Sequence, residues 1–264
     1  MEATGGFSFP PGIGIQDVKG CGTSGMAALD PETRYIIKFP LGDDDECARC
    51  DQEREIYQLL ELSSHPRPSS LLKFHGVTSY GILLDYAELG PVRQFLHKSQ
   101  YSVPISTLLR WAQQAAEALQ FIQANGICHG DVSCTNFFLD QSLDLKVGDF
   151  TSSFNNSPAT PEAFQEDILN YGSALYEMAT GHLPCPNLCE DEREQRFKQK
   201  AYPDLTNVEM KSMILRCWDG QYTSFTNILE DINTAHQKYS QQSCFAKAFA
   251  FILLIHVVDI SLRH

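Results

Sequence analysis

The feature that most constrains the fold of this chain is an abrupt change of sequence texture near Gly90. Short segments rich in β-branched and aromatic residues, separated by glycine and proline, fill roughly the first 90 residues, and long amphipathic segments dominate afterwards. Strands grouped before helices are typical of an α+β architecture. The sequence therefore predicts a strand-rich lobe followed by a mostly helical lobe, with a ligand-binding cleft between them.

The individual segments agree with this division. Residues 15–29 fit a strand, a glycine turn and a second strand, residues 33–40 fit a short strand, and two more strands flank Tyr80-Gly81. The acidic segment 42–66 predicts a helix with its apolar side at Ile56, Leu59, Leu60 and Leu62. Later helices are expected at 105–126, with Leu108, Ala112, Ala115, Leu119 and Ile122 on one face, and at 166–184, 208–218 and 225–237.

Charge and composition exclude some classes of function. The 264 residues carry a formal net charge of −13, which repels phosphate backbones, so we expect no nucleic-acid partner. We see no secretory signal at the start of the sequence, and we expect its nine cysteines to be reduced thiols. Both expectations indicate a cytoplasmic protein. The uncharged apolar stretch 248–258 is shorter than the ~20 residues of a membrane-spanning helix, so membrane contact through it is not expected.

The first chemical motif is GCGTSG at residues 20–25, which has the form GxGxxG. A strand follows it, whereas a dinucleotide-binding loop would open into a helix. This order favours a flexible glycine lid whose N–H groups lie over phosphates. Lys38 follows within an apolar strand, and Glu55 in the predicted helix is a candidate ion-pair partner that would aim the ammonium group at phosphate oxygens.

The second motif combines CHGDVSCTNFFLD at 128–140 with KVGDF at 146–150. A hairpin there would bring Asp131, Asn136 and Asp149 to one place. Asp131 can accept a proton from an attacking hydroxyl group. Asn136 and Asp149 offer the hard oxygen ligands that Mg²⁺ prefers when it bridges nucleotide phosphates. Each residue alone would be an ordinary turn former, but the ordered set points to phosphoryl transfer.

With these motifs in order, the chain resembles a eukaryotic protein kinase domain, and most closely the divergent kinase-like proteins of filamentous fungi. GCGTSGMA resembles the glycine-rich loop, YIIK the strand lysine, LLDYAELG the hinge with Leu84 as gatekeeper, HGDVSCTN the catalytic loop and DFT the DFG motif. The resemblance implies an α+β fold with two lobes: a small antiparallel β-sheet N-lobe with one helix, and a larger, mostly helical C-lobe. Its expected bounds are a loose lead-in at 1–14, an N-lobe at about 15–84, a hinge at 85–90, a C-lobe at 91–238 and a C-terminal tail of unassigned role at 239–264.

The resemblance also implies a reaction. ATP and Mg²⁺ are the expected cofactors, the γ-phosphate is transferred to Ser or Thr hydroxyls of a protein substrate, and the chain is expected to be a monomer. The catalytic residues are then Asp131, Lys38 and Glu55, and the metal ligands are Asn136 and Asp149. ATP binding is assigned to Gly20, Gly22, Gly25, Ala27, Ile36, Lys38, Leu84, Asp85 and Ala87.

Several departures from the family pattern leave other functions open. Gly130 replaces the usual Arg of the catalytic loop, Ser133 replaces a Lys, and Thr151 replaces the Gly of DFG. Without that Arg we expect no switch by phosphorylation, and alanine at Ser152, Ser153, Ser157 or Thr160 should leave activity unchanged. One alternative is a pseudokinase that binds nucleotide or acts as a scaffold. Another is a small-molecule kinase, because HGD followed by Asn also resembles choline and aminoglycoside phosphotransferases.

Overall fold

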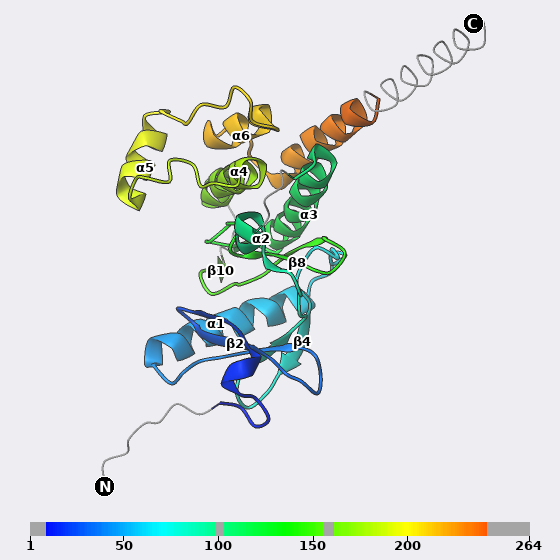
Figure 1. Cartoon of the computed structure of the whole chain (residues 1–264), viewed down its shortest axis with the longest axis vertical. Helices are drawn as coiled ribbons and strands as arrows, with labels where there is room; N and C mark the ends of the chain where they lie inside the picture. Colours follow the sequence, from blue (N-terminus) through cyan, green and yellow to red (C-terminus); the bar gives the residue numbers. More distant parts are fainter. Residues whose placement is uncertain (1–8, 99–102, 156–160, 242–264) are drawn as a thin grey trace, which may run out of the picture.

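The computed structural model describes residues 9–98, 103–155 and 161–241, and Figure 1 shows them as two lobes. The small lobe is built on a five-stranded antiparallel sheet with the order β1-β2-β3-β5-β4. Its strands are β1 (Val18–Gly22), β2 (Gly25–Leu29), β3 (Ile36–Phe39), β4 (Phe74–Val77) and β5 (Ile82–Leu84). One long helix, α1 (Asp44–Glu61), and a short 3-10 turn, η1 (Ile15–Asp17), complete this lobe. The predicted strand-rich N-lobe with one helix is confirmed.

The turn between β1 and β2 depends on a glycine. Gly25 has a φ of +112°, and a Cβ atom at this position would lie 2.2 Å from the carbonyl oxygen of Phe39 on β3. Only a residue without a side chain allows β2 to approach β3 this closely at the end of the turn. The register then pairs Ala27 of β2 with Lys38 of β3, so the lysine lies on the strand next to the one that leaves the glycine loop.

Helix α1 begins where the acidic segment predicts. The Asp43 side chain caps the helix by accepting a hydrogen bond from the Asp45 N–H at 2.9 Å. Its buried face differs from the predicted one: Glu53, Ile56, Tyr57 and Leu60 are buried. The prediction that Leu59 and Leu62 belong to the apolar side was wrong, because these side chains are 42% and 83% exposed.

The large lobe is mostly helical, as predicted. Its helices are α2 (Val92–Lys98), α3 (Ile105–Ala124), α4 (Gln165–Thr180), α5 (Glu190–Lys198) and α6 (Lys211–Trp218), and residues 225–241 form a further helix. The predicted face of α3 is buried in full and packs against the β9 segment and α4. The short helices α2 and α5 were not predicted from the sequence.

Short strands lie where the two lobes meet (Figure 1). β6 (Gly90–Pro91), β8 (Phe137–Leu139) and β9 (Leu145–Val147) form a three-stranded sheet, and β7 (Ile127–Cys128) pairs with β10 (Phe154–Asn155). The β8–β9 hairpin confirms the predicted hairpin between Asn136 and Asp149. A 3-10 turn, η2 (Pro161–Phe164), leads into α4.

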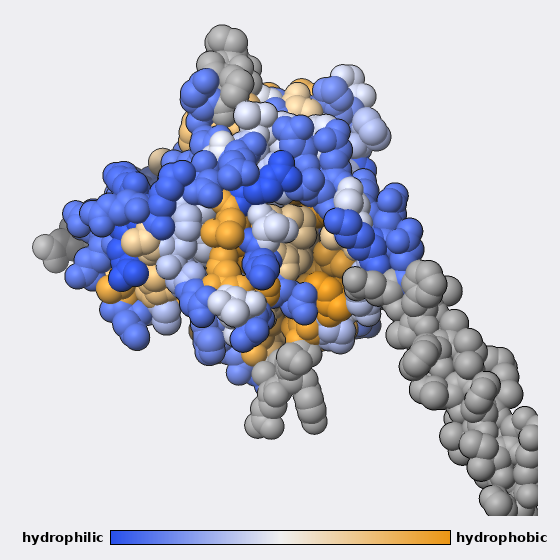
Figure 2. Space-filling view, turned by 90° about the horizontal axis from the view of Figure 1, so that it is seen from above, coloured by the Kyte–Doolittle hydropathy of each residue, from blue (hydrophilic) through white to orange (hydrophobic). Residues whose placement is uncertain are grey.

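Figure 2 shows the molecule from above the large lobe, where the surface is mostly hydrophilic and a band of hydrophobic side chains crosses it. Most large apolar side chains of the described residues lie inside, in one core that joins α1, the β8–β9 hairpin and the helices of the large lobe. In the part of the chain that the structure describes, no helix has both the length and the apolarity to cross a membrane. The apolar stretch 248–258 lies outside the described residues.

Candidate active site

A cavity of about 470 Å³ lies between the lobes, a size suited to a small ligand. It is lined by the β1–β2 loop, β3, the segment after β5, and the loops around β8 and β9. Of the residues predicted for the site, these line it: Gly20, Gly22, Gly25, Ala27, Ile36, Lys38, Leu84, Asp85, Ala87, Asp131, Asn136 and Asp149. Side chains far apart in the sequence therefore meet at one pocket.

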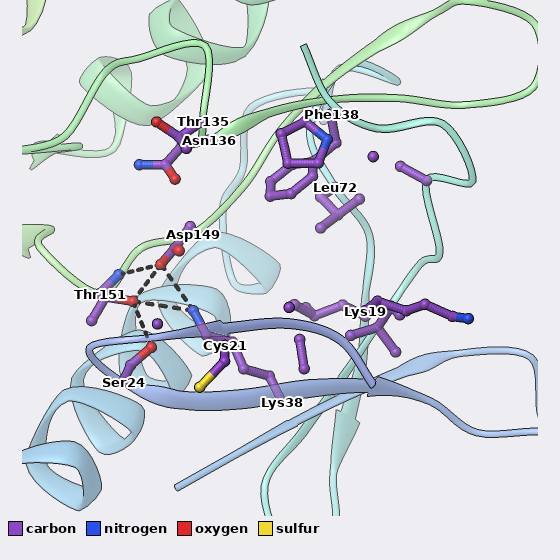
Figure 3. A pocket seen from close by; sticks show the side chains of 18 of the residues that line it. Lys19, Cys21, Ser24, Lys38, Leu72, Thr135, Asn136, Phe138, Asp149 and Thr151 are labelled. Carbon is purple, nitrogen blue, oxygen red and sulfur yellow. Dashed lines mark hydrogen bonds and ion pairs between the residues drawn. The ribbon is translucent and has the colours of Figure 1, made fainter. Parts of the chain in front are cut away.

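Lys38 is the charged centre of this cavity. Its Nζ atom lies 2.6 Å from Oε2 of Glu53 and 2.9 Å from Oδ1 of Asp149. The Lys38 side chain is 11% exposed and that of Glu53 is fully buried, so this is an internal ion pair shielded from water. Figure 3 shows Lys38 and Asp149 pointing toward each other between the glycine loop and the β9 segment.

The ion-pair partner of Lys38 is not the residue predicted from the sequence. Glu55 was predicted for this role, but its side chain is exposed and Glu53 makes the ion pair. Residues two apart on a helix are rotated by about 200° around the helix axis and so lie on nearly opposite faces, and only one of the two can face β3. The signal that identifies Glu53 is its spacing of three, four and seven residues from the buried Ile56, Tyr57 and Leu60.

The electrostatics of this cluster follow from its burial and composition. Burial acts to lower the pKa of Lys38, but the nearby carboxylates of Glu53 and Asp149 outweigh it and hold that pKa above its ordinary value. Burial acts to raise the pKa of Asp149, and the Lys38 charge and hydrogen bonds from Lys38 and Thr151 outweigh it and lower the pKa. Asp149 is therefore ionised at neutral pH, as a metal ligand must be.

The loop before β8 positions the other two polar residues. The Asn136 side-chain amide donates to the Asp131 carbonyl oxygen at 2.9 Å, and the Gly148 N–H donates to the Asn136 carbonyl oxygen at 3.0 Å. The first bond tightens the loop and the second joins it to the end of β9. The Asp131 side chain is exposed to the cavity, where a hydroxyl group of a bound molecule can reach it.

An unpredicted residue, Asp167 at the start of α4, anchors this loop. Its two carboxylate oxygens accept hydrogen bonds from the His129 N–H at 2.7 Å and the Gly130 N–H at 2.9 Å. Asp167 is only 4% exposed. The sequence shows an acidic residue in the first turn of an amphipathic helix. It does not show which backbone N–H groups that residue binds, because they lie 37 and 38 residues earlier in the chain.

Gly130 stands where the family resemblance predicts an Arg, and the geometry gives a reason. Its φ is +78°, and a Cβ atom there would lie 2.3 Å from the carbonyl oxygen of Ser152. The segment after Asp149 thus packs directly on the catalytic loop, at a distance that no side chain at position 130 allows.

A series of ring contacts, one stacked, one edge to face and one tilted, connects the two lobes. Tyr57 of α1 lies 5.4 Å from Phe74 and 4.8 Å from Phe150, and Phe150 lies 5.3 Å from His129, all measured between ring centroids. The Phe150 N–H also donates to Oε1 of Glu53 at 3.2 Å. Phe150 therefore packs inward, and this packing fixes α1 in the position at which Glu53 reaches Lys38.

Ser153 holds the segment after Asp149 from inside the protein. Its hydroxyl group is buried and donates to the His129 carbonyl oxygen at 2.7 Å, so alanine there removes an internal hydrogen bond. Ser152 lines the cavity, while Ser157 and Thr160 lie outside the described residues. The segment is held against the catalytic loop by this bond and by the β7–β10 pairing.

Comparison with known proteins identifies the family of this chain. The family model described as protein tyrosine and serine/threonine kinase matches residues 23–161, more than half of the chain. The chain is 22% identical over 227 residues to serine/threonine/tyrosine-protein kinase HT1 of Arabidopsis thaliana, covering 74% of this chain and 57% of that protein. It is 23% identical over 219 residues to serine/threonine-protein kinase STY17 of the same plant, covering 71% of this chain and 38% of that protein.

A third relative, serine/threonine-protein kinase A-Raf of Mus musculus, is 23% identical over 179 residues, which cover 57% of this chain and 30% of that protein. The chain thus spans between about a third and little more than half of the length of these relatives. The matched residues include Lys38, Glu53, Asp131, Asn136 and Asp149, and they form the cavity described above. The chain therefore belongs to the protein tyrosine and serine/threonine kinase family.

Proposed function

We propose that this chain is an ATP- and Mg²⁺-dependent protein kinase domain that transfers the γ-phosphate to Ser or Thr hydroxyl groups of proteins. The observation that carries the proposal is the meeting of Lys38, Glu53 and Asp149 at contact distance, in the cavity that Asp131 and Asn136 also line. Phosphoryl transfer depends chiefly on positioning and on charge stabilisation, and these side chains supply both.

The nucleotide base is assigned to the apolar part of the cavity, between Ala27 and Ile36 of the sheet and Phe138 of β8, beside the segment Leu84–Ala87. The triphosphate then lies under the glycine loop, whose backbone N–H groups favour phosphate oxygens. Lys38, held by Glu53 and Asp149, contacts those phosphates with an ammonium group that stays charged.

The residues present suit magnesium. Asp149 and Asn136 carry hard oxygen ligands and line the same cavity, and Asp149 keeps its carboxylate ionised. One ammonium group between two carboxylates leaves the cluster one negative charge, which favours a cation. When bound, magnesium would neutralise the phosphate charge that develops during transfer.

Asp131 is proposed as the group that orients the acceptor hydroxyl and takes its proton. Its backbone is fixed by Asn136 and, through the neighbouring residues, by Asp167, so that the exposed carboxylate keeps its direction. Loss of a general base of this kind typically lowers the rate by about 10²–10⁴-fold.

The experiment that tests the proposal has two stages. Mg-ATP should raise the melting temperature of the wild-type chain and not that of Asp149→Ala, and a protein such as casein should then be phosphorylated by the wild type and not by Asp149→Ala. Asp131→Asn should keep nucleotide binding and lose transfer. Glu55→Gln, which removes an exposed carboxylate from the same helix as Glu53, is the matched control and should retain both properties. Phosphate found only on tyrosine of the acceptor would contradict the proposed Ser/Thr preference.

A specific observation favours a second candidate, a nucleotide-binding pseudokinase. Ser133 replaces the lysine that would face the γ-phosphate, and its hydroxyl group bonds to Thr135 at 2.9 Å. The transferring phosphate thus loses one cationic contact. Binding of Mg-ATP by the wild type without transfer to any acceptor would favour this candidate. Transfer to a small alcohol such as choline, and to no protein, would favour the small-molecule alternative.

A further inference from the structure

Thr151 makes three polar contacts that a glycine at the same place would not make. Its hydroxyl oxygen is hydrogen-bonded to Oδ1 of Asp149, lies 3.1 Å from Nζ of Lys38 and lies 3.3 Å from the hydroxyl oxygen of Ser24 (Figure 3). A threonine hydroxyl group has one proton to donate and two lone pairs to accept with. Lys38 donates to this oxygen, and Thr151 is the donor toward both Asp149 and Ser24, so its one proton is given to one of these two acceptors at a time.

Ser24 lies in the turn between β1 and β2, at the tip of the glycine loop, and is only 4% exposed. The backbone of the same turn is held from the other side by α1. The Cys50 thiol donates to the Ser24 carbonyl oxygen at 2.9 Å, and the Arg49 guanidinium donates to the Thr23 carbonyl oxygen at 3.1 Å. The side chain of Ser24 therefore contacts the floor of the cleft while its backbone rests on α1.

The orientation of Asp149 depends on the same hydroxyl group. Within the described residues, the contacts that Asp149 makes with Lys38 and Thr151 all fall on Oδ1. None of these three contacts involves Oδ2. The Thr151 hydroxyl group thus lies within hydrogen-bond distance both of the carboxylate that the proposed function assigns to magnesium and of Ser24 in the loop that it assigns to the phosphates.

We propose that Thr151 is a positioning residue that fastens the glycine-loop tip, through Ser24, to the Asp149 carboxylate. The proposal rests on the proposed function for its consequence: a nucleotide can enter or leave the phosphate end of the cleft only after the bond between Ser24 and Thr151 opens. Closure of the loop and alignment of the metal-binding carboxylate are then coupled, because the same hydroxyl group contacts both.

The first test measures the loop without any nucleotide. Hydrogen exchange of the amides in residues 18–25 is followed by mass spectrometry for the full chain carrying Thr151→Val, Ser24→Ala, both changes, or Thr151→Ser. Loss of one hydrogen bond should speed exchange in this segment about threefold to tenfold in either single variant. The double variant should exchange no faster than the singles, because both remove the same bond. Thr151→Ser keeps the hydroxyl group and should match the wild type.

The chain offers a matched control in Asp204-Leu205-Thr206. There the Thr206 hydroxyl group donates to Oδ1 of Asp204 at 2.6 Å, and the Thr206 N–H donates to the same atom at 2.9 Å, which reproduces the local pattern of Asp149 and Thr151 outside the cleft. Thr206→Val should leave exchange in residues 18–25 unchanged. Ser24→Ala tests the same bond from its other end if Thr151→Val fails to fold.

Three results would overturn the proposal. The amides of residues 18–25 could exchange at the wild-type rate in both single variants, exchange faster than wild type in Thr151→Ser, or exchange faster in the double variant than in either single variant. The second test measures dissociation of a fluorescent ATP analogue with magnesium, which should be about threefold to tenfold faster in Ser24→Ala. Normal dissociation from a loop that exchanges faster would show that the bond does not gate the nucleotide. If the wild type binds no nucleotide at all, the proposed function fails, and the exchange result still decides whether the bond holds the loop.

Discussion

The replacement of Glu53 by glutamine, compared with the same replacement of Glu55, tests the central ion pair of the site. Both changes convert a carboxylate to an amide of the same shape on the same helix, and both alter the net charge equally. The Glu53 side chain is fully buried against Lys38 at 2.6 Å, whereas Glu55 is exposed. The two variants therefore differ only in the contacts of the carboxylate that each one removes.

The expected cost can be worked from the contacts. Removing one partner of a buried ion pair typically lowers the free energy of unfolding by about 3–5 kcal/mol. Lys38 retains Asp149 at 2.9 Å in Glu53→Gln, so we expect the lower end, about 3 kcal/mol. For a chain of this size, that corresponds to a fall in melting temperature of about 6–12 °C. Glu55→Gln should change the free energy of unfolding by less than about 0.5 kcal/mol.

The assay is urea denaturation followed by circular dichroism at neutral pH, with a second measurement of stabilisation by Mg-ATP. Glu53→Gln should lose most of the stabilisation by Mg-ATP, because Lys38 is no longer held over the phosphates, and Glu55→Gln should keep it. Equal stability of the two variants would refute the reasoning, as would a Glu55→Gln variant that loses nucleotide binding while Glu53→Gln retains it.

Three further predictions concern other parts of the site. Gly130→Ala should destabilise the chain more than Gly181→Ala, because both have a φ near +78° (+78° and +77°) but only a Cβ at 130 meets a backbone oxygen, that of Ser152 at 2.3 Å; urea denaturation of the two variants compares them. Burial and the Glu53 charge raise the pKa of the Cys50 thiol to about 11, so iodoacetamide at pH 8 should label the exposed Cys21 much faster than Cys50, and Mg-ATP should protect Cys21, which lines the cavity; peptide mass spectrometry measures both, and equal labelling would contradict the assignment. Ser153→Ala should lower the free energy of unfolding by about 1 kcal/mol through loss of its bond to the His129 carbonyl, whereas Ser152→Ala should not, and indistinguishable unfolding curves would disprove this difference.

The sequence by itself determined the parts of this protein that depend on local preferences. Glycine turns and β-branched runs predicted β1 to β5, and the apolar face of α3 followed from a spacing of three and four residues. The β8–β9 hairpin brought Asn136 and Asp149 together because a hairpin places the residues at its two open ends side by side. The order of the motifs was enough to indicate the family and most of the cavity.

The short helices escaped prediction for a physical reason. α2 has only seven residues, and α5 has nine with none of them buried. Helices this short are marginal by intrinsic preference, and neither offers a long apolar stripe that periodicity would reveal. Their presence depends on the capping interactions and neighbours that the folded chain provides.

Only the tertiary structure decided which glutamate binds Lys38. The candidates Glu53 and Glu55 are two positions apart, and the choice depends on which face of α1 meets the sheet and the Phe150 ring, which Tyr57 contacts edge to face. The contact between Thr151 and Ser24 joins residues 127 positions apart, and no local pattern marks it. Local preference fixes the shape of each segment, but the rotation of a helix about its axis and the meeting of distant side chains are set when the segments pack against one another.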